Sequence, residues 1–247
     1  SAISLKINKA GKEQIIFQKN PEEILPIASL TKLMTALIVL ESYPSDLENI
    51  WITISSEAAN QEDVPFYGNL KAEERFNLKQ LLDLTLIYSS NDAAFALAET
   101  IGLENFVERM NQKARELGLK NTNFVNPTGL DPENLYYHLP NRESFNYSTA
   151  KDLAKLAQYI VKNYPLIFEI SLQAKPNLVK NGLPNLSLPE NFKLIGGKTG
   201  YTNEAGGCFL VVFQDEKGSL FFNLILGTEK EKRTEEMQKL IDWISGL

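Results

Sequence analysis

The chain has 247 residues, of which 43% are hydrophobic and 23% are charged, the usual balance of a soluble globular protein with a buried core. A net charge of −6 argues against nucleic acid as a partner, because proteins that bind nucleic acid present a basic face. One cysteine and one histidine exclude an intrachain disulfide and leave too few ligands for a structural zinc site, so we expect neither a metal nor a cofactor.

The chain begins with a pattern typical of a β-hairpin. Apolar and polar residues alternate over 3–7 and again over 14–18, with a turn at 9–12 between them. After a loop bracketed by two prolines, a helix is predicted from about Ser29 to Tyr43, where the next residue, a proline, ends it. The apolar run inside this helix is far shorter than the roughly 18 residues that a membrane-spanning helix needs.

The middle of the chain is predicted to be helical. Apolar spacing and capping residues place helices over about 78–86 after Asn77, over 92–101, over 104–117 before Gly118, and from Ser148 or Thr149, with Asp152 in its first turn, to just before Pro165.

The last part of the chain returns to strands and closes with a helix. Strands are predicted at 192–195, 207–213 and 220–226, and a final helix carries apolar residues at 237, 240, 241 and 244. This order predicts one α+β domain, with an antiparallel sheet built from both chain ends, flanked by helices, and an inserted, mainly helical lobe. We place the sheet lobe at about 1–45 and 171–247, and the helical lobe at about 46–170.

The first chemistry-bearing motif is Ser29-Leu30-Thr31-Lys32. Residues three apart lie on one face of a helix, so the Ser29 hydroxyl is within reach of the Lys32 amine. A serine hydroxyl needs an adjacent base to act as a nucleophile, and a lysine can serve if burial and a second cation lower its pKa. Taken alone, the pattern is more often a helix cap followed by a surface lysine.

Two further motifs complete the set. Ser89-Ser90-Asn91 lies on a predicted turn between helices, and Lys198-Thr199-Gly200 follows a predicted strand. Alone, the first would be a helix cap and the second an ordinary strand end. Together, S-x-x-K, S-x-N and K-T-G in this order are typical of class A β-lactamases and penicillin-binding proteins.

The chain resembles the low-molecular-mass D-alanyl-D-alanine carboxypeptidases, which are penicillin-binding proteins of the β-lactamase/transpeptidase-like fold. The resemblance extends over nearly the whole chain and is carried by segments 26–36, 89–94, 126–131, 148–152 and 197–202. In the second segment, the middle position of the motif is often glycine in that family and is Ser90 here.

The resemblance implies roles for nine residues. Ser29 would be the nucleophile, Lys32 its general base, and Ser89 the relay of a proton to the leaving amine. Asn91, Lys198, Thr199, Gly200, Tyr201 and Arg233 would bind the substrate. Within this set the backbone N–H groups of Ser29 and Tyr201 would form an oxyanion hole. Arg233 is the best match for the arginine that meets the substrate carboxylate in that family, next to Lys230 and Lys232, and its alternative role is that of a solvated helix charge. The single cysteine, Cys208, falls in a strand pattern and is expected in the core.

The predicted function is that of a serine-type D-alanyl-D-alanine carboxypeptidase that acts on the stem peptides of peptidoglycan and is acylated by β-lactams. Such an enzyme works outside the cytoplasm, in the periplasm or at the cell surface, so we expect this location. The alternatives are a D,D-endopeptidase with the same residues, a β-lactamase of the same fold, and a noncatalytic β-lactam sensor. A class A β-lactamase also needs a glutamate for deacylation, and we find no matching segment between the second and third motifs.

Overall fold

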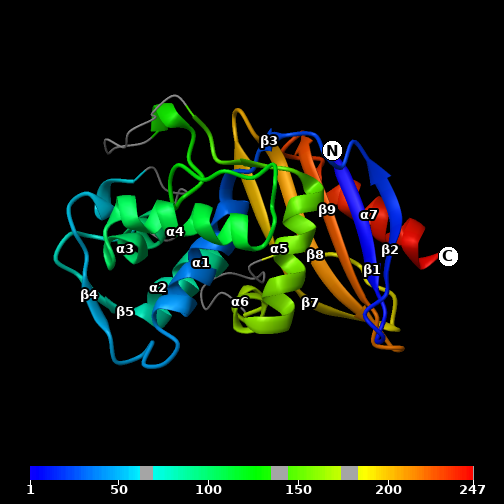
Figure 1. Ribbon diagram of the computed structural model, residues 1–247, viewed down its shortest axis with the longest axis horizontal. Helices are drawn as coiled ribbons and strands as arrows, with labels where there is room; N and C mark the ends of the chain where they lie inside the picture. Colours follow the sequence, from blue (N-terminus) through cyan, green and yellow to red (C-terminus); the bar gives the residue numbers. More distant parts are fainter. Residues whose placement is uncertain (62–68, 135–143, 174–182, 247) are drawn as a thin grey trace.

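A five-stranded antiparallel sheet forms one half of the molecule. The computed structural model describes residues 1–61, 69–134, 144–173 and 183–246, and Figure 1 shows their arrangement. The sheet has the order β2-β1-β9-β8-β7. Its strands are β1 (Ala2–Ile7), β2 (Glu13–Lys19), β7 (Phe192–Thr202), β8 (Gly206–Asp215) and β9 (Leu220–Thr228).

The sheet joins the two ends of the chain, as predicted. β1 pairs with β9 in an unbroken antiparallel register from Ala2 opposite Ile225 to Ile7 opposite Leu220. The predicted strand near residues 192–195 is too short, because β7 continues to Thr202. The K-T-G motif therefore lies inside an edge strand and not after a strand end, and its backbone is held by β8.

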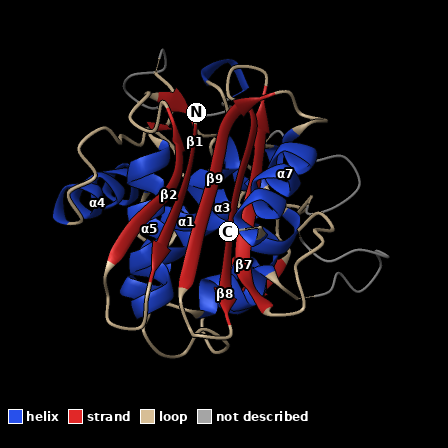
Figure 2. Ribbon diagram, turned by 90° about the vertical axis from the view of Figure 1, so that its right-hand side faces the viewer, coloured by secondary structure: helices blue, strands red, loops and turns tan. Residues whose placement is uncertain are grey.

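Helices cover both faces of this sheet (Figure 2). On one face lies α7 (Arg233–Ser245), and on the other lie α1 (Thr31–Ser42) and α5 (Ala150–Asn163). Side chains alternate along β8, so that Phe209, Val211 and Phe213 join the core beneath α7, whereas Cys208, Leu210 and Val212 join the larger core on the opposite face. Burial on both faces explains why this strand is an almost continuous apolar run.

The remaining elements lie beyond α1, away from the sheet (Figure 1). They are α2 (Leu78–Asp83), a π-helical turn (Leu84–Tyr88), α3 (Asn91–Glu99), α4 (Leu103–Glu116), the 3-10 turns Ala58–Asn60 and Pro132–Asn134, and the strand pair β4 (Trp51–Thr53) and β5 (Arg75–Asn77). β3 (Leu25–Pro26) pairs with β6 (Tyr147–Ser148), and α6 (Leu166–Ser171) packs against β7. Of these elements, α2, α3 and α4 correspond to predicted helices. The short strands, the 3-10 turns, the π-helical turn and α6 were not expected from the sequence.

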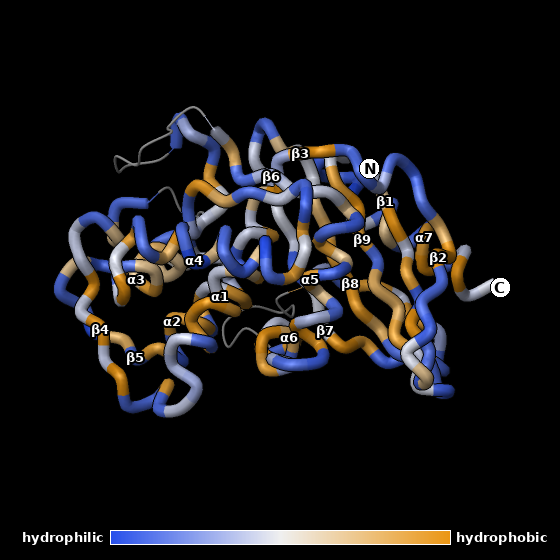
Figure 3. Tube along the Cα trace, viewed as in Figure 1, coloured by the Kyte–Doolittle hydropathy of each residue, from blue (hydrophilic) through white to orange (hydrophobic). Residues whose placement is uncertain are grey.

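The central helix is α1, whose first ten residues, 31–40, are all buried. It is apolar around most of its circumference, which is typical of a helix surrounded by protein, and Figure 3 shows the hydrophobic segments gathered around it. The helix proper begins at Thr31, two residues later than predicted. Ser29 instead belongs to a 3-10 turn, Ala28–Leu30, that leads into it.

The capping residues behave largely as predicted. Asn77 forms a capping box with Gln80 at the start of α2. Thr149, and not Ser148, caps α5 by accepting a hydrogen bond from the Asp152 amide. Although α5 falls in the stretch predicted as helical lobe, it packs on β1 and β9 of the sheet. The division into two lobes by residue number stays a prediction.

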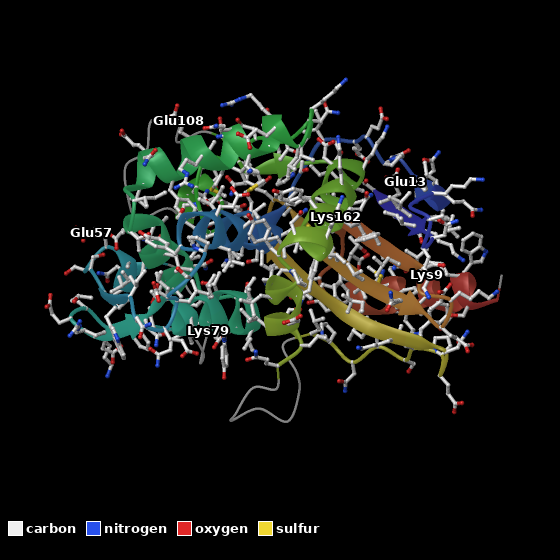
Figure 4. All side chains as sticks on the ribbon, turned by 60° about the horizontal axis from the view of Figure 1, so that its bottom comes forward. Lys9, Glu13, Glu57, Lys79, Glu108 and Lys162 are labelled. Atoms are coloured by element: carbon white, nitrogen blue, oxygen red, sulfur yellow. The ribbon has the colours of Figure 1, made fainter. Side chains whose placement is uncertain are left out.

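Many charged side chains lie at the periphery of the molecule, whereas Lys32 and Lys198 are buried. The labelled lysines and glutamates in Figure 4 come from both the sheet half and the helical half, and they belong to none of the three motifs. Among the described residues, no helix combines the length and the apolar character needed to cross a bilayer.

A bulge in β7 fixes how α6 meets the sheet. The register with β8 shifts between Leu194 and Gly196, and Gly196 has a φ of +155°. A Cβ atom at Gly196 would lie 2.5 Å from the Cβ of Phe168 and 2.8 Å from its carbonyl oxygen. Only glycine therefore lets β7 approach α6 this closely.

Replacing Gly196 with alanine is expected to destabilise the fold by about 2 kcal/mol, because a side chain in a filled site forces packed neighbours apart. The measurement is equilibrium urea unfolding, followed by circular dichroism. Gly102→Ala is the control, since Gly102 has a similar need for positive φ (+83°) but no atom within 4 Å of its Cβ position. Equal destabilisation by both substitutions would show that the close approach to Phe168 is not the cause.

Candidate active site

The serine and the lysine of the S-x-x-K motif are in contact in the structure. The Lys32 Nζ atom donates a hydrogen bond to the Ser29 Oγ atom over 3.0 Å. Ser29 is half-buried, whereas Lys32 has no exposed surface at all. An ammonium or amine in such a position must be hydrogen-bonded, because burial of an unpaired polar group costs several kcal/mol.

Two more oxygen atoms surround the Lys32 amine. Its Nζ atom lies 2.6 Å from Oδ1 of Asn91, at the start of α3, and 2.7 Å from the backbone carbonyl oxygen of Thr128. Both are acceptors only. The amine thus joins three segments of the chain: the turn before α1, the S-x-N motif, and the loop that follows α4.

The second lysine meets the first hydroxyl of the S-x-N motif. Lys198 is 2% exposed, and its Nζ atom donates to Ser89 Oγ over 2.8 Å and to the Thr199 carbonyl over 2.9 Å. Ser89 follows the π-helical turn Leu84–Tyr88 and has left-handed backbone angles, with φ of 64° and ψ of 28°. A non-glycine residue in this conformation is strained, and such strain concentrates at functional sites.

All three motifs therefore meet at one place. Lys32 contacts Asn91 and Lys198 contacts Ser89, so that both buried amines lie on the same short segment between the π-helical turn and α3. The predicted interhelical turn is confirmed. The π-helical turn was not predicted, because its sequence has no residue type that distinguishes it from an ordinary α-helix.

The K-T-G strand packs directly on the serine turn. A Cβ atom at Gly200 would lie 3.1 Å from the Ser29 backbone nitrogen and 3.1 Å from the Ala28 Cβ atom. Ala28 itself has a positive φ of 46°, next to Ser29 in the chain. Tyr201, 38% exposed, follows in the strand, with the Lys230 ammonium 4.4 Å from its ring centroid.

Arg233 is hydrogen-bonded to the backbone of this strand. Its Nη1 atom donates to the Gly200 carbonyl oxygen over 2.9 Å, and burial lowers the pKa of its guanidinium. Lys232 is exposed and paired with Glu229 over 2.7 Å. Arg233 thus joins Lys198 as a cation at the K-T-G backbone, and a guanidinium has further N–H groups for a carboxylate.

Sequence reasoning did not find the Thr128 carbonyl. The segment Asn126-Pro-Thr-Gly was recognised only as a family landmark and a loop. A backbone carbonyl can come from any residue type, so the only signal was the turn itself, with Gly129 at a φ of +86°. A Cβ atom at Gly129 would lie 2.0 Å from the Ala28 carbonyl oxygen, which shows how closely this loop approaches the serine turn.

The site is identified by its chemistry and not by its volume. An apolar groove of about 550 Å³ lies between α7 and the ends of β1 and β9, beside Ala2, Ile225 and Trp243. No motif residue lines it. Among the described residues, no cluster of three or more histidine, cysteine, aspartate or glutamate side chains is arranged to hold a metal ion.

Comparison with known proteins shows the family of the chain. The family model for D-alanyl-D-alanine carboxypeptidases of the Peptidase_S11 type matches residues 2–228. The chain belongs to this family. It is 34% identical over 221 residues to the D-alanyl-D-alanine endopeptidase of Escherichia coli, with 84% of this chain and 66% of the relative covered.

The chain is also similar to other carboxypeptidases and penicillin-binding proteins. The D-alanyl-D-alanine carboxypeptidase DacF of Bacillus subtilis is 33% identical over 245 residues, covering 93% of this chain and 58% of the relative. The chain thus spans about three fifths of the length of such relatives. The solved structure of penicillin-binding protein D2 from Listeria monocytogenes in its cefotaxime-bound form superposes with a TM-score of 0.77 at 25% identity, covering 97% of this chain and 95% of that one. The predicted fold class is confirmed.

Cys208, the only cysteine of this S11 family member, lies directly behind the site. It faces Gly200 across the β7–β8 pair and is fully buried. Burial raises the pKa of its thiol to about 11, although a backbone hydrogen bond from Gly227 and the charge of Arg233 act in the opposite direction. Cys208 is therefore part of the core, as predicted. A thiol that stays protonated is also a poor nucleophile.

We expect the Cys208 thiol to be unreactive toward a disulfide reagent at pH 8 while the protein is folded, and to react once urea unfolds it. Because the pKa is raised in the folded state, the protonated thiol stabilises the fold, and this stabilisation decreases at high pH. Its contribution is fully present below the thiol's ordinary pKa near 9 and is lost as pH rises through about 11. Rapid labelling of the folded protein at pH 8 would contradict the burial of this thiol.

Proposed function

We propose that this protein is a serine-type D-alanyl-D-alanine carboxypeptidase that cuts peptidoglycan stem peptides through an acyl-enzyme at Ser29. One observation carries the proposal: two buried lysines each bind a different hydroxyl, and both contact the segment 89–91. Lys32 binds Ser29 and also Asn91, and Lys198 binds Ser89. A nucleophile with a base, and a second hydroxyl with a second cation, are the parts that acyl transfer at a peptide bond requires.

Lys32 is placed to act as the general base. A neutral lysine amine has two N–H donors and one lone pair. Asn91 Oδ1 and the Thr128 carbonyl can only accept, so they take the two donors. The ammonium form donates to Ser29 Oγ as well, whereas in the neutral form the lone pair can accept from the Ser29 hydroxyl across the same 3.0 Å. The geometry supports removal of the Ser29 proton by the neutral form of Lys32.

Ser89 is placed to pass a proton to the leaving group. Lys198 donates to the Ser89 oxygen, so the Ser89 hydrogen points to another acceptor. A hydroxyl has one donor and can accept twice, which lets it give its proton to a leaving amine while it receives one from a neighbouring base. The Lys198 charge also favours negative charge that develops on nearby oxygens.

The open edge of β7 and Arg233 are proposed to bind the substrate. In the described sheet, β7 pairs only with β8, so an extended peptide can lie along Thr199, Gly200 and Tyr201. The backbone N–H groups of Ser29 and Tyr201 would stabilise the oxyanion, and each such donor contributes roughly 3 kcal/mol in serine proteases. Thr199 and Arg233 would bind the terminal carboxylate, and Asn91 the substrate amide.

The reaction proceeds in two steps. The Ser29 oxygen attacks the carbonyl carbon of the penultimate D-alanine, the C–N bond to the terminal D-alanine breaks, and the Ser29 proton ends on the departing amine. Water then attacks the ester, releasing the shortened peptide and restoring the serine hydroxyl. A β-lactam carries a strained amide with a nearby carboxylate, so it is expected to acylate Ser29 in the same way. The cefotaxime-bound form of the Listeria protein supports this partner.

The place of action follows from the substrate. Peptidoglycan strands and their cross-links lie outside the cytoplasmic membrane, so we propose an extracytoplasmic location for this chain. One alternative keeps specific support. The similarity to an E. coli D-alanyl-D-alanine endopeptidase, at 34% identity, is as strong as that to the carboxypeptidase DacF, at 33%. The same residues can cleave a cross-link if the acceptor side of the site accommodates a second stem peptide.

Acylation is the direct test. After incubation with benzylpenicillin, intact-mass spectrometry is expected to show an increase of one drug equivalent, and Ser29→Ala is expected to remove it. Ser45→Ala, on an exposed loop, serves as the control and should be acylated like the wild type. A wild-type protein without an adduct would refute the proposed nucleophile.

A second assay separates the candidate activities. The carboxypeptidase releases D-alanine from diacetyl-Lys-D-Ala-D-Ala, the endopeptidase converts cross-linked muropeptide dimers to monomers, and a noncatalytic sensor does neither after acylation. Rapid turnover of nitrocefin would instead favour a β-lactamase.

Arg233→Ala is expected to lower kcat/KM for a D-Ala-D-Ala peptide by tenfold to a hundredfold, since hydrogen bonds to a charged group contribute about 1.5–3 kcal/mol. The informative quantity is the ratio of kcat/KM for the peptide acid to kcat/KM for its C-terminal amide. In this variant the ratio should fall toward one. Lys232→Ala, which removes an exposed cation, should keep the wild-type ratio. An unchanged ratio in Arg233→Ala would exclude this arginine as the carboxylate ligand.

A further inference from the structure

Asn146 binds the chain on both sides of the serine. It immediately precedes β6 and is 3% exposed. Its backbone carbonyl accepts a hydrogen bond from the Ile27 amide over 3.2 Å, and its Nδ2 atom donates to the Thr31 Oγ1 atom over 2.9 Å. Ile27 precedes Ser29 by two residues and Thr31 follows it by two, so one asparagine fixes both ends of the serine turn.

The same side chain also holds the loop after α4. The Asn146 Nδ2 atom donates to the Asn126 carbonyl over 2.9 Å, and its Oδ1 atom accepts from the Val125 amide over 2.7 Å and the Asn126 amide over 3.1 Å. A longer contact of 3.3 Å joins Nδ2 to Asn126 Oδ1. Every polar atom of the Asn146 side chain therefore has a partner in this loop or in α1.

Asn126 in turn orients the carbonyl that binds Lys32. Its Oδ1 atom accepts from the Thr128 amide over 3.0 Å, from the Thr128 hydroxyl over 3.0 Å and from the Gly129 amide over 2.7 Å. These bonds fix the peptide between Thr128 and Gly129, whose oxygen lies 2.7 Å from Lys32 Nζ. The chain of contacts runs from Thr31 through Asn146 and Asn126 to Lys32.

We propose that Asn146 is a positioning residue that sets the geometry of the Ser29–Lys32 pair, by fixing the serine turn and the Thr128 carbonyl relative to each other. This inference rests on the proposed function. Asn146 contacts neither Ser29 nor Lys32, and it acts through Thr31, Ile27 and Asn126. If the Thr128 carbonyl turned away, one Lys32 N–H would lose its acceptor, and the amine lone pair would no longer be directed at the Ser29 hydroxyl.

The arrangement requires a carboxamide. The Nδ2 atom faces acceptors only, the Thr31 hydroxyl oxygen, the Asn126 carbonyl and, at 3.3 Å, Asn126 Oδ1, whereas the Oδ1 atom faces two backbone donors. Aspartate has the same shape but presents an oxygen to the Asn126 carbonyl. It also adds a buried negative charge near Lys32, which favours the ammonium over the neutral amine.

Three other charged groups on the elements around Lys32 bear on its protonation. Lys198 of β7 is bonded to Ser89, Asp92 of α3 accepts from the Leu70 amide over 2.9 Å, and Asp131 of the same loop as Thr128 faces the Glu204 amide at 3.4 Å. A substitution at position 146 changes none of these groups. A change in the pH profile of that variant is therefore attributable to the lost amide and the added charge.

The test is the acylation rate constant of Asn146→Asp with a fluorescent penicillin, measured from pH 5.5 to pH 10. We expect the rate at neutral pH to fall about tenfold and to recover as pH rises, because a shift of one pKa unit moves the acid limb of the profile by one pH unit. Asn223→Asp is the matched control, since Asn223 is a fully buried asparagine in β9 that bonds to backbone carbonyls only. Its profile should keep the wild-type shape even if its stability falls.

An Asn146→Asp profile that matches the wild type after scaling would overturn the inference, because a merely structural role lowers the rate equally at every pH. If that variant does not fold, Thr31→Val gives the second measurement, since it removes only the hydroxyl that Asn146 binds. We then expect a roughly tenfold lower acylation step with unchanged penicillin binding. An unchanged acylation step in Thr31→Val would equally overturn it. A wild type that is never acylated contradicts the proposed function as well, which distinguishes the two failures.

Discussion

The burial of one lysine is the constraint on which the rest of the structure depends. Lys32 lies at the start of a helix that is enclosed on all sides, where water cannot solvate its amine. Oxygen atoms must therefore come from the protein, and they come from three segments that are far apart in the chain: Ser29, Asn91 and Thr128. Holding these segments together requires α3 and the loop after α4 to converge on the N-terminal end of α1. The helical half of the fold can be understood as the support for this convergence.

The sheet contributes the second half of the same arrangement. Its edge strand brings Lys198 to Ser89 and places Gly200 against the serine turn. Two glycines make this possible: a Cβ atom at Gly129 would lie 2.0 Å from the Ala28 carbonyl oxygen, and one at Gly200 would lie 3.1 Å from the Ser29 backbone nitrogen. The positive φ of Ala28 is kept by these neighbours on both sides, since an isolated alanine would avoid it.

Much of the fold and the three motifs could be predicted from sequence because their signals are local. Strand alternation, helix caps such as Asn77 and the order of S-x-x-K, S-x-N and K-T-G all depend on residue types at short spacing. The third acceptor of Lys32 could not be predicted, since a backbone carbonyl at Thr128 has no residue-type signature. Asn146 was missed because its partners at Thr31 and Asn126 are near only after folding. The start of α1 was misplaced for a related reason: the 3-10 turn at Ser29 is imposed by packing against β7 and the Gly129 loop.

The pairing of β1 with β9 has a consequence for how the protein comes to be made. The backbone of Ser1 meets that of Leu226 across 225 positions of sequence, and such distant contacts form late and slowly. During synthesis, Ser29 and Lys32 leave the ribosome long before Lys198 and the strand that carries it. The growing polypeptide thus holds a serine that is not yet paired with its full set of partners, and chemical competence arises only when the last strands join the sheet. The three motifs are therefore complete only once the sheet has closed.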